Sequence, residues 1–214
     1  MKTKKIIALF LVIAMIMSMS VAAFATELPE GGSSRTNVAE YSFDEIKALG
    51  QYITVKNGYF SFNSSEAFAN GIDQILIEAV ATRIYSLNKQ KENAIITISN
   101  NGVVTPRYMQ IVPAFWHAYD CHGGINKPAI EYWWGYSRTM CDCESRKFAA
   151  DLNTAAAIAG GSALLGAWFP PFATGGILSA SYLLLLSSRV TANNRGRGVI
   201  ADVTWALVFN ITPQ

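Results

Sequence analysis

The alternation of apolar and polar residues changes its period several times, and each change predicts a new element. A short helix is expected over Tyr41–Leu49, with Ser42 as its N-cap. In the stretch YITVKNGYFSF, from Tyr52 to Phe62, apolar and aromatic residues flank Asn57-Gly58, the strongest short sequence signal for a β-hairpin. We therefore expect a helix and then a tight hairpin at the start of the domain.

A long amphipathic helix is predicted from Ser65 to Lys89. Apolar residues recur there at intervals of three and four, and Ser64 or Ser65 can cap the start of the helix. Because its polar face is not rich in Lys or Arg, this helix is expected to pack on a core rather than to lie on a membrane surface.

Three later stretches predict a small, mostly antiparallel sheet. Ala94–Ser99 precedes a turn at residues 100–102, so Val103-Val104 can pair back. Ile130–Tyr136 (IEYWWGY) indicates an aromatic strand in which Gly135 marks a bulge or a close backbone approach. Val199–Ile211 indicates one buried strand or two linked strands. The expected fold class is α+β.

An uncharged stretch separates Asp151 from Arg189. A helix is expected to start near Thr139 and to continue until Pro170-Pro171 interrupts it, and a second helix should run from about Gly175 to Val190. Together they form an apolar α-helical hairpin over residues 152–190, packed on the sheet. Each half has about seventeen residues, or about 25 Å of helix, which is slightly short for a membrane span.

The two halves of this hairpin differ in side-chain size. The first is rich in Ala and Gly at four-residue spacing, which permits close helix packing, and the second contains four consecutive leucines, Leu183 to Leu186. A helix that is apolar on all sides lies in the centre of a protein or in a membrane. Three arrangements remain open: a permanently buried hairpin, a hairpin that is sheltered in water and inserts into a bilayer, and a constitutive two-span membrane protein.

The first 25 residues predict export. Three lysines, an apolar run and an Ala-Phe-Ala site fit a secretory signal peptide over residues 1–25; the alternative is a retained membrane anchor. Residues 26–40 are polar and contain Pro, Gly and Ser, which predicts a disordered N-terminus or propeptide, and residues 41–214 should form a single α+β domain. The expected location is extracellular.

Removal of the signal peptide leaves the chain close to neutral. The full chain has 17 basic and 15 acidic residues, and the signal carries three lysines and no acid, so 14 basic residues remain against 15 acidic ones. A near-neutral chain without a Lys/Arg-rich stripe is not expected to bind nucleic acid.

Three cysteines, Cys121, Cys141 and Cys143, follow the signal peptide. Export permits a disulfide, and Cys121 is expected to pair with one of the other two, which lie too close together for an easy mutual bridge. His117 and His122 flank Cys121, but C-x-C is not the spacing of a zinc site, so no metal is expected. No recognised catalytic motif surrounds these residues; we expect no enzyme activity and no cofactor.

Several residues near the hairpin are candidates for a membrane interface. Trp prefers such interfaces, and arginines can meet lipid headgroups. For the pair Trp133-Trp134, a core-facing strand is the competing interpretation. The stretch from Asn194 to Gly198 lacks a following G-K-[ST] and is expected to be a tight connection from helix to strand. The candidate interface residues are Trp133, Trp134, Trp168, Arg189, Arg195 and Arg197.

The order of these elements resembles a set of small secreted proteins of Gram-positive bacteria, similar to large, heat-labile bacteriocins of the geobacillin type. The sharpest matches are Trp133-Trp134-Gly135 and Gly196-x-Gly198-Val199-Ile200, and the resemblance covers residues 64–214. It implies an antibacterial protein, with no catalytic residue to carry over. The uncharged hairpin adds the expectation that the partner is bacterial membrane lipid. The alternative is a secreted interaction, adhesion or immunity module with a permanently buried hairpin.

Overall fold

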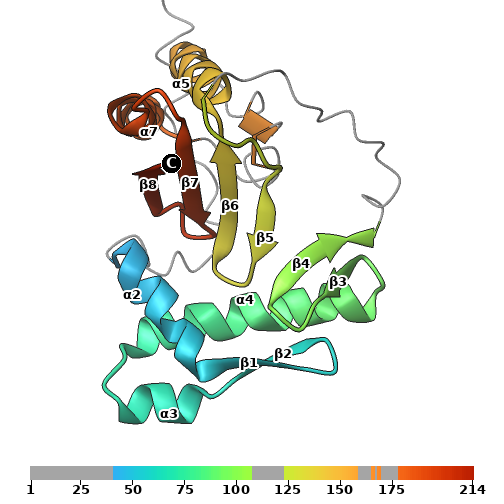
Figure 1. Cartoon of the computed structure of the whole chain (residues 1–214). Helices are drawn as coiled ribbons and strands as arrows, with labels where there is room; N and C mark the ends of the chain where they lie inside the picture. Colours follow the sequence, from blue (N-terminus) through green and yellow to red (C-terminus); the bar gives the residue numbers. More distant parts are fainter. Residues whose placement is uncertain (1–40, 108–122, 159–164, 167, 170–177) are drawn as a thin grey trace, which may run out of the picture. The chain divides into compact units, whose positions relative to one another are not determined.

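The computed structural model describes residues 41–107, 123–158, 165–166, 168–169 and 178–214 (Figure 1). These residues belong to one compact unit, Thr36–Gln214. The fold is α+β: helices accompany a two-stranded hairpin and a six-stranded antiparallel sheet. The predicted signal peptide and the stretch 26–40 lie outside the described residues, as do Cys121, His117 and His122.

The six-stranded sheet is a meander, in which every strand pairs antiparallel with the next one in sequence. All three predicted strand regions contribute to it, and Val199–Ile211 proves to hold two linked strands rather than one. The strands in order are β3 (Ile96–Ile98), β4 (Val103–Pro106), β5 (Ile130–Tyr132), β6 (Gly135–Met140), β7 (Val199–Thr204) and β8 (Phe209–Pro213).

The predicted N-terminal helix and hairpin are confirmed. In α2 (Phe43–Ala48), Ser42 and Glu45 form a reciprocal capping box, and η3 (Leu49–Tyr52) leads into β1 (Ile53–Lys56). At the turn to β2 (Tyr59–Phe62), Asn57 and Gly58 have φ of 53° and 72°. Positive φ at both positions is what a type I′ turn requires, and Asn-Gly adopts it at little cost.

The prediction of one helix over Ser65–Lys89 is wrong, because the chain breaks it into α3 (Ser64–Ala69) and α4 (Gln74–Glu92). Gly71, with φ of 81°, donates to the Phe68 carbonyl at 2.9 Å, and Ile72 donates to the Ala67 carbonyl at 3.1 Å. This pair of bonds is a Schellman motif with glycine in the left-handed position. Asp73 then caps α4, and Asn63, rather than either serine, caps α3.

The aromatic stretch 130–136 is not one strand. Tyr132 pairs with Gly135, so Trp133-Trp134 forms a two-residue turn between β5 and β6. Gly135 has φ of 147°, and a Cβ there would lie 2.6 Å from the Cα of Thr204. The expected close backbone approach at Gly135 is therefore confirmed, while the continuous strand is corrected to a hairpin.

Two helices flank the uncharged stretch, and both differ from expectation. Because β6 continues to Met140, α5 (Asp142–Ala157) starts three residues late, and it ends before Ile158, whose backbone is extended. The expected continuation past Ile158 is wrong; two glycines follow closely in the sequence, and each costs a helix about 1 kcal/mol relative to alanine. The second helix, α7 (Ala180–Asn193), begins after Ser179 instead of near Gly175. Pro170-Pro171 lies outside the described residues, so the hairpin is described only at its two ends.

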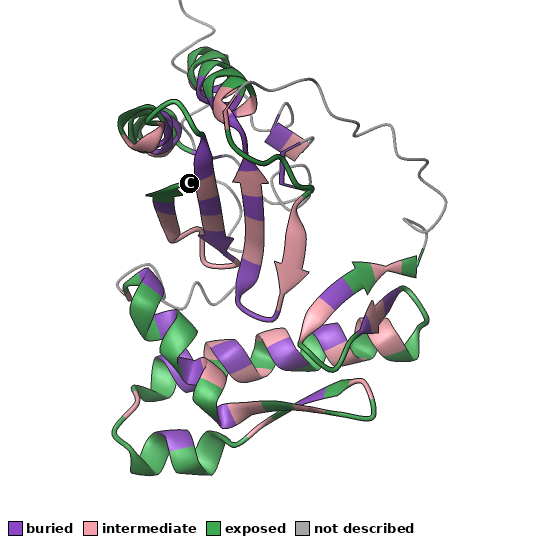
Figure 2. Ribbon diagram, in the orientation of Figure 1, coloured by how far each residue is buried: buried purple, intermediate pink, exposed green. Residues whose placement is uncertain are grey.

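The buried side chains form two clusters, which we call the first and second core (Figure 2). The first core lies among α2, β1, β2, α4, β3 and β4, and includes Trp133 and Trp134. In the second core α5 and α7 pack on each other, with Ser187 Oγ donating to the buried Ala149 carbonyl at 2.9 Å, and both cover the side of β6–β8 that carries Met140 and Val199. None of the described helices is long and apolar enough to span a bilayer.

Replacement of Gly135 by alanine is expected to destabilise the fold by about 3 kcal/mol or more, because the new methyl group meets the backbone of β7 and the residue must keep a positive φ. Urea unfolding measures the change. Gly71→Ala is the matched control: its φ is also positive, but a Cβ there has no neighbour within 4 Å, so about 1 kcal/mol is expected. Equal losses in the two variants would contradict the role of the β6–β7 contact.

Candidate functional site

Trp168, in the uncharged stretch, is held by three kinds of contact. Its indole Nε1 donates to Asp151 Oδ2 of α5 at 2.8 Å, and its carbonyl accepts from Arg138 Nη1 of β6 at 3.0 Å. The Arg138 guanidinium lies 4.5 Å from the Trp168 ring centroid, and the Phe148 ring centroid lies 5.1 Å away. With 4% of Trp168 exposed, this residue docks the uncharged stretch onto the second core. We call Arg138, Asp151, Phe148 and Trp168 the Trp168 site.

The positive charge in this site belongs to Arg138, which is buried on the helix-covered side of β6. Burial lowers the pKa of Arg138, and Glu144, whose carboxylate lies 4.0 Å from the guanidinium, acts in the opposite direction. Arginine nevertheless stays protonated in proteins. A buried cation is costly unless its donors are satisfied, so the Trp168 carbonyl and ring help to offset the cost of burying Arg138.

Sequence inspection identified Trp168 but missed Arg138 and Asp151 as its partners. A period-two signal was available for Arg138, because Tyr136, Arg138 and Met140 alternate along one strand and point to the same side. Asp151 was noted only as the boundary of the uncharged stretch, and nothing in the sequence indicated its contact with Trp168. That contact joins residues 17 positions apart through a backbone path that local patterns do not determine.

The candidate interface residues divide into two groups. Trp133 and Trp134 are 8% and 6% exposed and belong to the first core, and Trp168 is buried in the second, so in this conformation none of the three indoles faces outward. Arg189, Arg195 and Arg197 are all exposed. The membrane role of these residues stays a prediction, but the three arginines and not the three tryptophans are the accessible members.

The connection from α7 to β7 is a tight junction, as expected. Asn194 donates to Asp142 Oδ1 at 2.8 Å and accepts from the Gly198 amide at 3.0 Å. Gly198 has φ of 89°, and a Cβ there would collide with the backbone of Met140 and Cys141. Gln214 closes the junction, since its side-chain amide donates to the Met140 carbonyl at 2.7 Å.

The cysteines differ in state. Cys141 is disulfide-bonded and directly precedes α5, whereas Cys143 is free and exposed. Within the described residues no three His, Cys, Asp or Glu side chains gather as ligands for a metal ion. The histidines that flank Cys121 lie outside these residues, so the expectation of no metal there stays a prediction.

A polar triad links α4 to the β5–β6 hairpin. Arg83 Nη2 contacts Glu131 Oε1 at 2.7 Å, and Glu131 lies opposite Tyr136 in the strand pairing. Burial, and next the negative charge of Glu131, raise the pKa of the Tyr136 hydroxyl well above its usual value. Such a tyrosine is kept protonated and is a poor base near neutral pH, so the triad is suited to joining elements rather than to proton transfer.

A shallow hollow of about 390 Å³ lies over the β1–β2 hairpin and the start of α3. Its lining is mainly polar and includes Lys56, Asn63 and Glu66. Ligand sites usually combine an apolar lining with a few convergent polar groups, which this open hollow does not provide. The described residues thus offer one distinctive arrangement, the Trp168 site, beside the exposed arginines.

Two half-buried tyrosines are expected to make the fold sensitive to alkali. Burial raises the pKa of Tyr182, whose hydroxyl donates to the Leu207 carbonyl at 2.8 Å, as it does for Tyr136. Unfolded tyrosine ionises near pH 10, so stability is complete below that pH and is lost above it, by about 1.4 kcal/mol per pH unit for each tyrosine.

We expect the free energy of unfolding to fall less steeply above pH 10 in Tyr182→Phe than in the wild type. Urea titrations at pH 8 to 11 measure the slope. Tyr85→Phe is the control, because Tyr85 is 70% exposed. A Tyr182→Phe slope equal to that of the wild type would contradict this assignment.

Comparison with protein-family models, with curated proteins and with solved structures yields no match to this chain.

Proposed function

We propose that this chain is a secreted, non-enzymatic antibacterial protein that acts on the lipid membrane of other bacteria. The observation that carries the proposal is an uncharged run from Leu152 to Ser188 whose described residues pack against β6 and the first part of α5. These elements carry the charged residues Arg138 and Asp151, and we call them the frame. The frame holds the run through the Trp168 site. Release of the run would deliver a long apolar segment to a bilayer and would uncover the side of β6–β8 on which α7 packs.

The energetics separate what holds the segment from what attracts it to lipid. Leu165, Trp168 and Phe169 are already buried in the second core, so their transfer to lipid gains little. Leu184 and Leu185 of α7 are 51% and 50% exposed, and Ile158 at the end of α5 is also exposed. At about 25 cal/mol per Å², burial of such half-exposed side chains contributes about 1 kcal/mol each. The exposed residues therefore make the first contact with lipid, and the core residues follow.

The barrier to release lies in the Trp168 site. Separation of Trp168 from Asp151 and Arg138 breaks two hydrogen bonds and a cation–π contact. A hydrogen bond to a charged group is worth about 1.5–3 kcal/mol net, so the site can keep the segment docked in water. A membrane-bound state has to compensate for this loss.

A second candidate function is a secreted interaction module in which the segment never leaves the core. The burial of Leu165, Trp168, Phe169 and Leu178 favours it, because these residues are packed as in an ordinary protein interior. Hydrogen exchange with and without vesicles separates the two functions. Amides of α5 and α7 that remain fully protected in the presence of lipid would favour the module.

Purified protein lacking residues 1–25 is expected to release dye from lipid vesicles, because the segment perturbs the bilayer when it inserts. Fluorescence dequenching measures the release, and heat-unfolded protein serves as the control for non-specific hydrophobic effects. No release from vesicles of any composition would contradict the membrane function.

Asp151→Ala is expected to accelerate dye release and to lower the free energy of unfolding by about 1–3 kcal/mol, because it leaves the buried Trp168 Nε1 without its acceptor. Asn153→Ala, at an exposed position of the same helix, is the matched control. A variant that is less stable yet releases dye at the wild-type rate would show that the Trp168 site does not control release.

A further inference from the structure

The exposed charged side chains of the described residues from 123 to 214 are all positive. The acidic side chains in this part of the chain are half-buried, and four of the five have partners: Glu131 with Arg83, Asp142 with Arg146 and Asn194, Glu144 with Arg138, and Asp151 with Trp168. The fifth, Asp202, is half-buried in the middle of β7. The exposed cations are Lys127, Arg146, Lys147, Arg189, Arg195 and Arg197.

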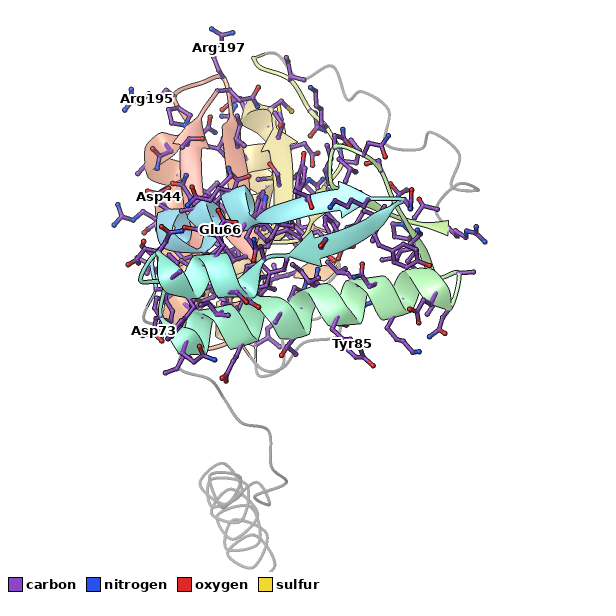
Figure 3. The ribbon with its side chains drawn as sticks, turned by 90° about the horizontal axis from the view of Figure 1, so that it is seen from below. Asp44, Glu66, Asp73, Tyr85, Arg195 and Arg197 are labelled. Carbon is purple, nitrogen blue, oxygen red and sulfur yellow. The ribbon has the colours of Figure 1, made fainter. Side chains whose placement is uncertain are left out.

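Most of these cations gather where α5 begins and α7 ends. The contact of Asn194 with Asp142 places the loop after α7 against the first turn of α5, which carries Arg146 one turn later. Arg195 and Arg197 lie in that loop, and Figure 3 shows both side chains pointing away from the ribbon. Arg189 precedes the loop on the exposed side of α7.

The exposed side of α7 continues from these cations into apolar residues. Leu185 lies one turn before Arg189, so the two share a face, and Leu184 is its neighbour. Because α5 and α7 run antiparallel, with Asp142 near Asn194 and Ala149 against Ser187, the exposed Ile158 lies toward the α7 start. The described exposed residues of α7 include no acid. One side of the α5–α7 pair thus presents cations at one end, with the exposed Leu184 and Leu185 of α7 about one turn before Arg189.

We propose that this side of the α5–α7 pair docks on bilayers that contain anionic phospholipid. The inference deepens the proposed function, on which it rests, by naming the lipid class and the surface of first contact. Positive charge alone attracts any polyanion, but Leu184 and Leu185 beside Arg189 match an interface in which phosphate groups border acyl chains. Neither contribution suffices for stable binding by itself, whereas the two together form a two-part anchor.

The proposal is tested by sedimentation with vesicles of phosphatidylcholine alone or with 30% phosphatidylglycerol. Each cation near an anionic surface contributes about a factor of five in partitioning, so the triple variant Arg189→Gln, Arg195→Gln, Arg197→Gln should lose about 100-fold on anionic vesicles and little on neutral ones. High salt should reduce wild-type binding in the same direction. Leu184→Ser with Leu185→Ser should weaken binding to both lipids.

The matched control is Lys56→Gln, Lys89→Gln, Arg107→Gln, which removes three exposed cations from the other part of the chain. Equal loss in both triple variants, or wild-type binding by the first, would overturn the proposed surface. Binding to single-stranded RNA as tight as to anionic vesicles and unaffected by the leucine substitutions would also overturn it.

The outcomes of docking and of permeabilisation are distinguishable. Charge-dependent binding without dye release supports the docking surface and rejects the membrane-active function. Dye release that the first triple variant retains at wild-type rate and dose supports the function and rejects the surface.

Discussion

A buried positive charge organises the relation between the frame of this protein and its uncharged stretch. Arg138 lies on the covered side of β6, where an ion without partners costs several kcal/mol. Glu144 at 4.0 Å supplies opposite charge, and Trp168 supplies both a carbonyl acceptor and an aromatic face. The stretch has no charge of its own, yet polar contacts with charged residues fix its place. Frame and stretch are therefore coupled in stability: displacement of Trp168 deprives Arg138 and Asp151 of partners at the same time.

This coupling changes which residues are relevant to the proposed membrane contact. In the sequence, the tryptophans are the obvious interface residues, but all three discussed above are buried in the two cores. Within the described residues from 123 to 214, the large exposed apolar residues are aliphatic, namely Ile125, Ile158, Leu184 and Leu185, and the exposed charged side chains are basic. This part of the folded protein consequently has a cationic and aliphatic surface, while the three tryptophans lie in the interior.

Local chemistry was sufficient where a short motif has one low-energy geometry. Asn57-Gly58 made the hairpin predictable, and Ser42 made the helix cap predictable. Stretches of β-forming residues next to turn residues did the same for the strand regions of the sheet. Prediction failed where a local stop competed with continuing periodicity: apolar spacing continued through Asn70-Gly71, although the glycine ends α3 in a Schellman motif. The aromatic β-propensity of residues 130–136 likewise concealed a turn at two tryptophans. The Trp168 site was beyond reach, since its partners come from β6 and α5 by tertiary packing.

The order of strand pairing in the sheet places the uncharged stretch between two neighbouring strands. Within the meander, β5–β6 and β7–β8 are joined by short turns, whereas β6 and β7 are separated by α5, the uncharged stretch and α7. The whole apolar segment is thus a long insertion between two strands that pair with each other. The entropic cost of closing such a loop grows only with the logarithm of its length. Residues added to or removed from the insertion should therefore have little effect on the pairing of β6 with β7. The apolar segment of such a chain can vary in length and sequence while the sheet stays the same, provided that one side chain still packs beside Arg138.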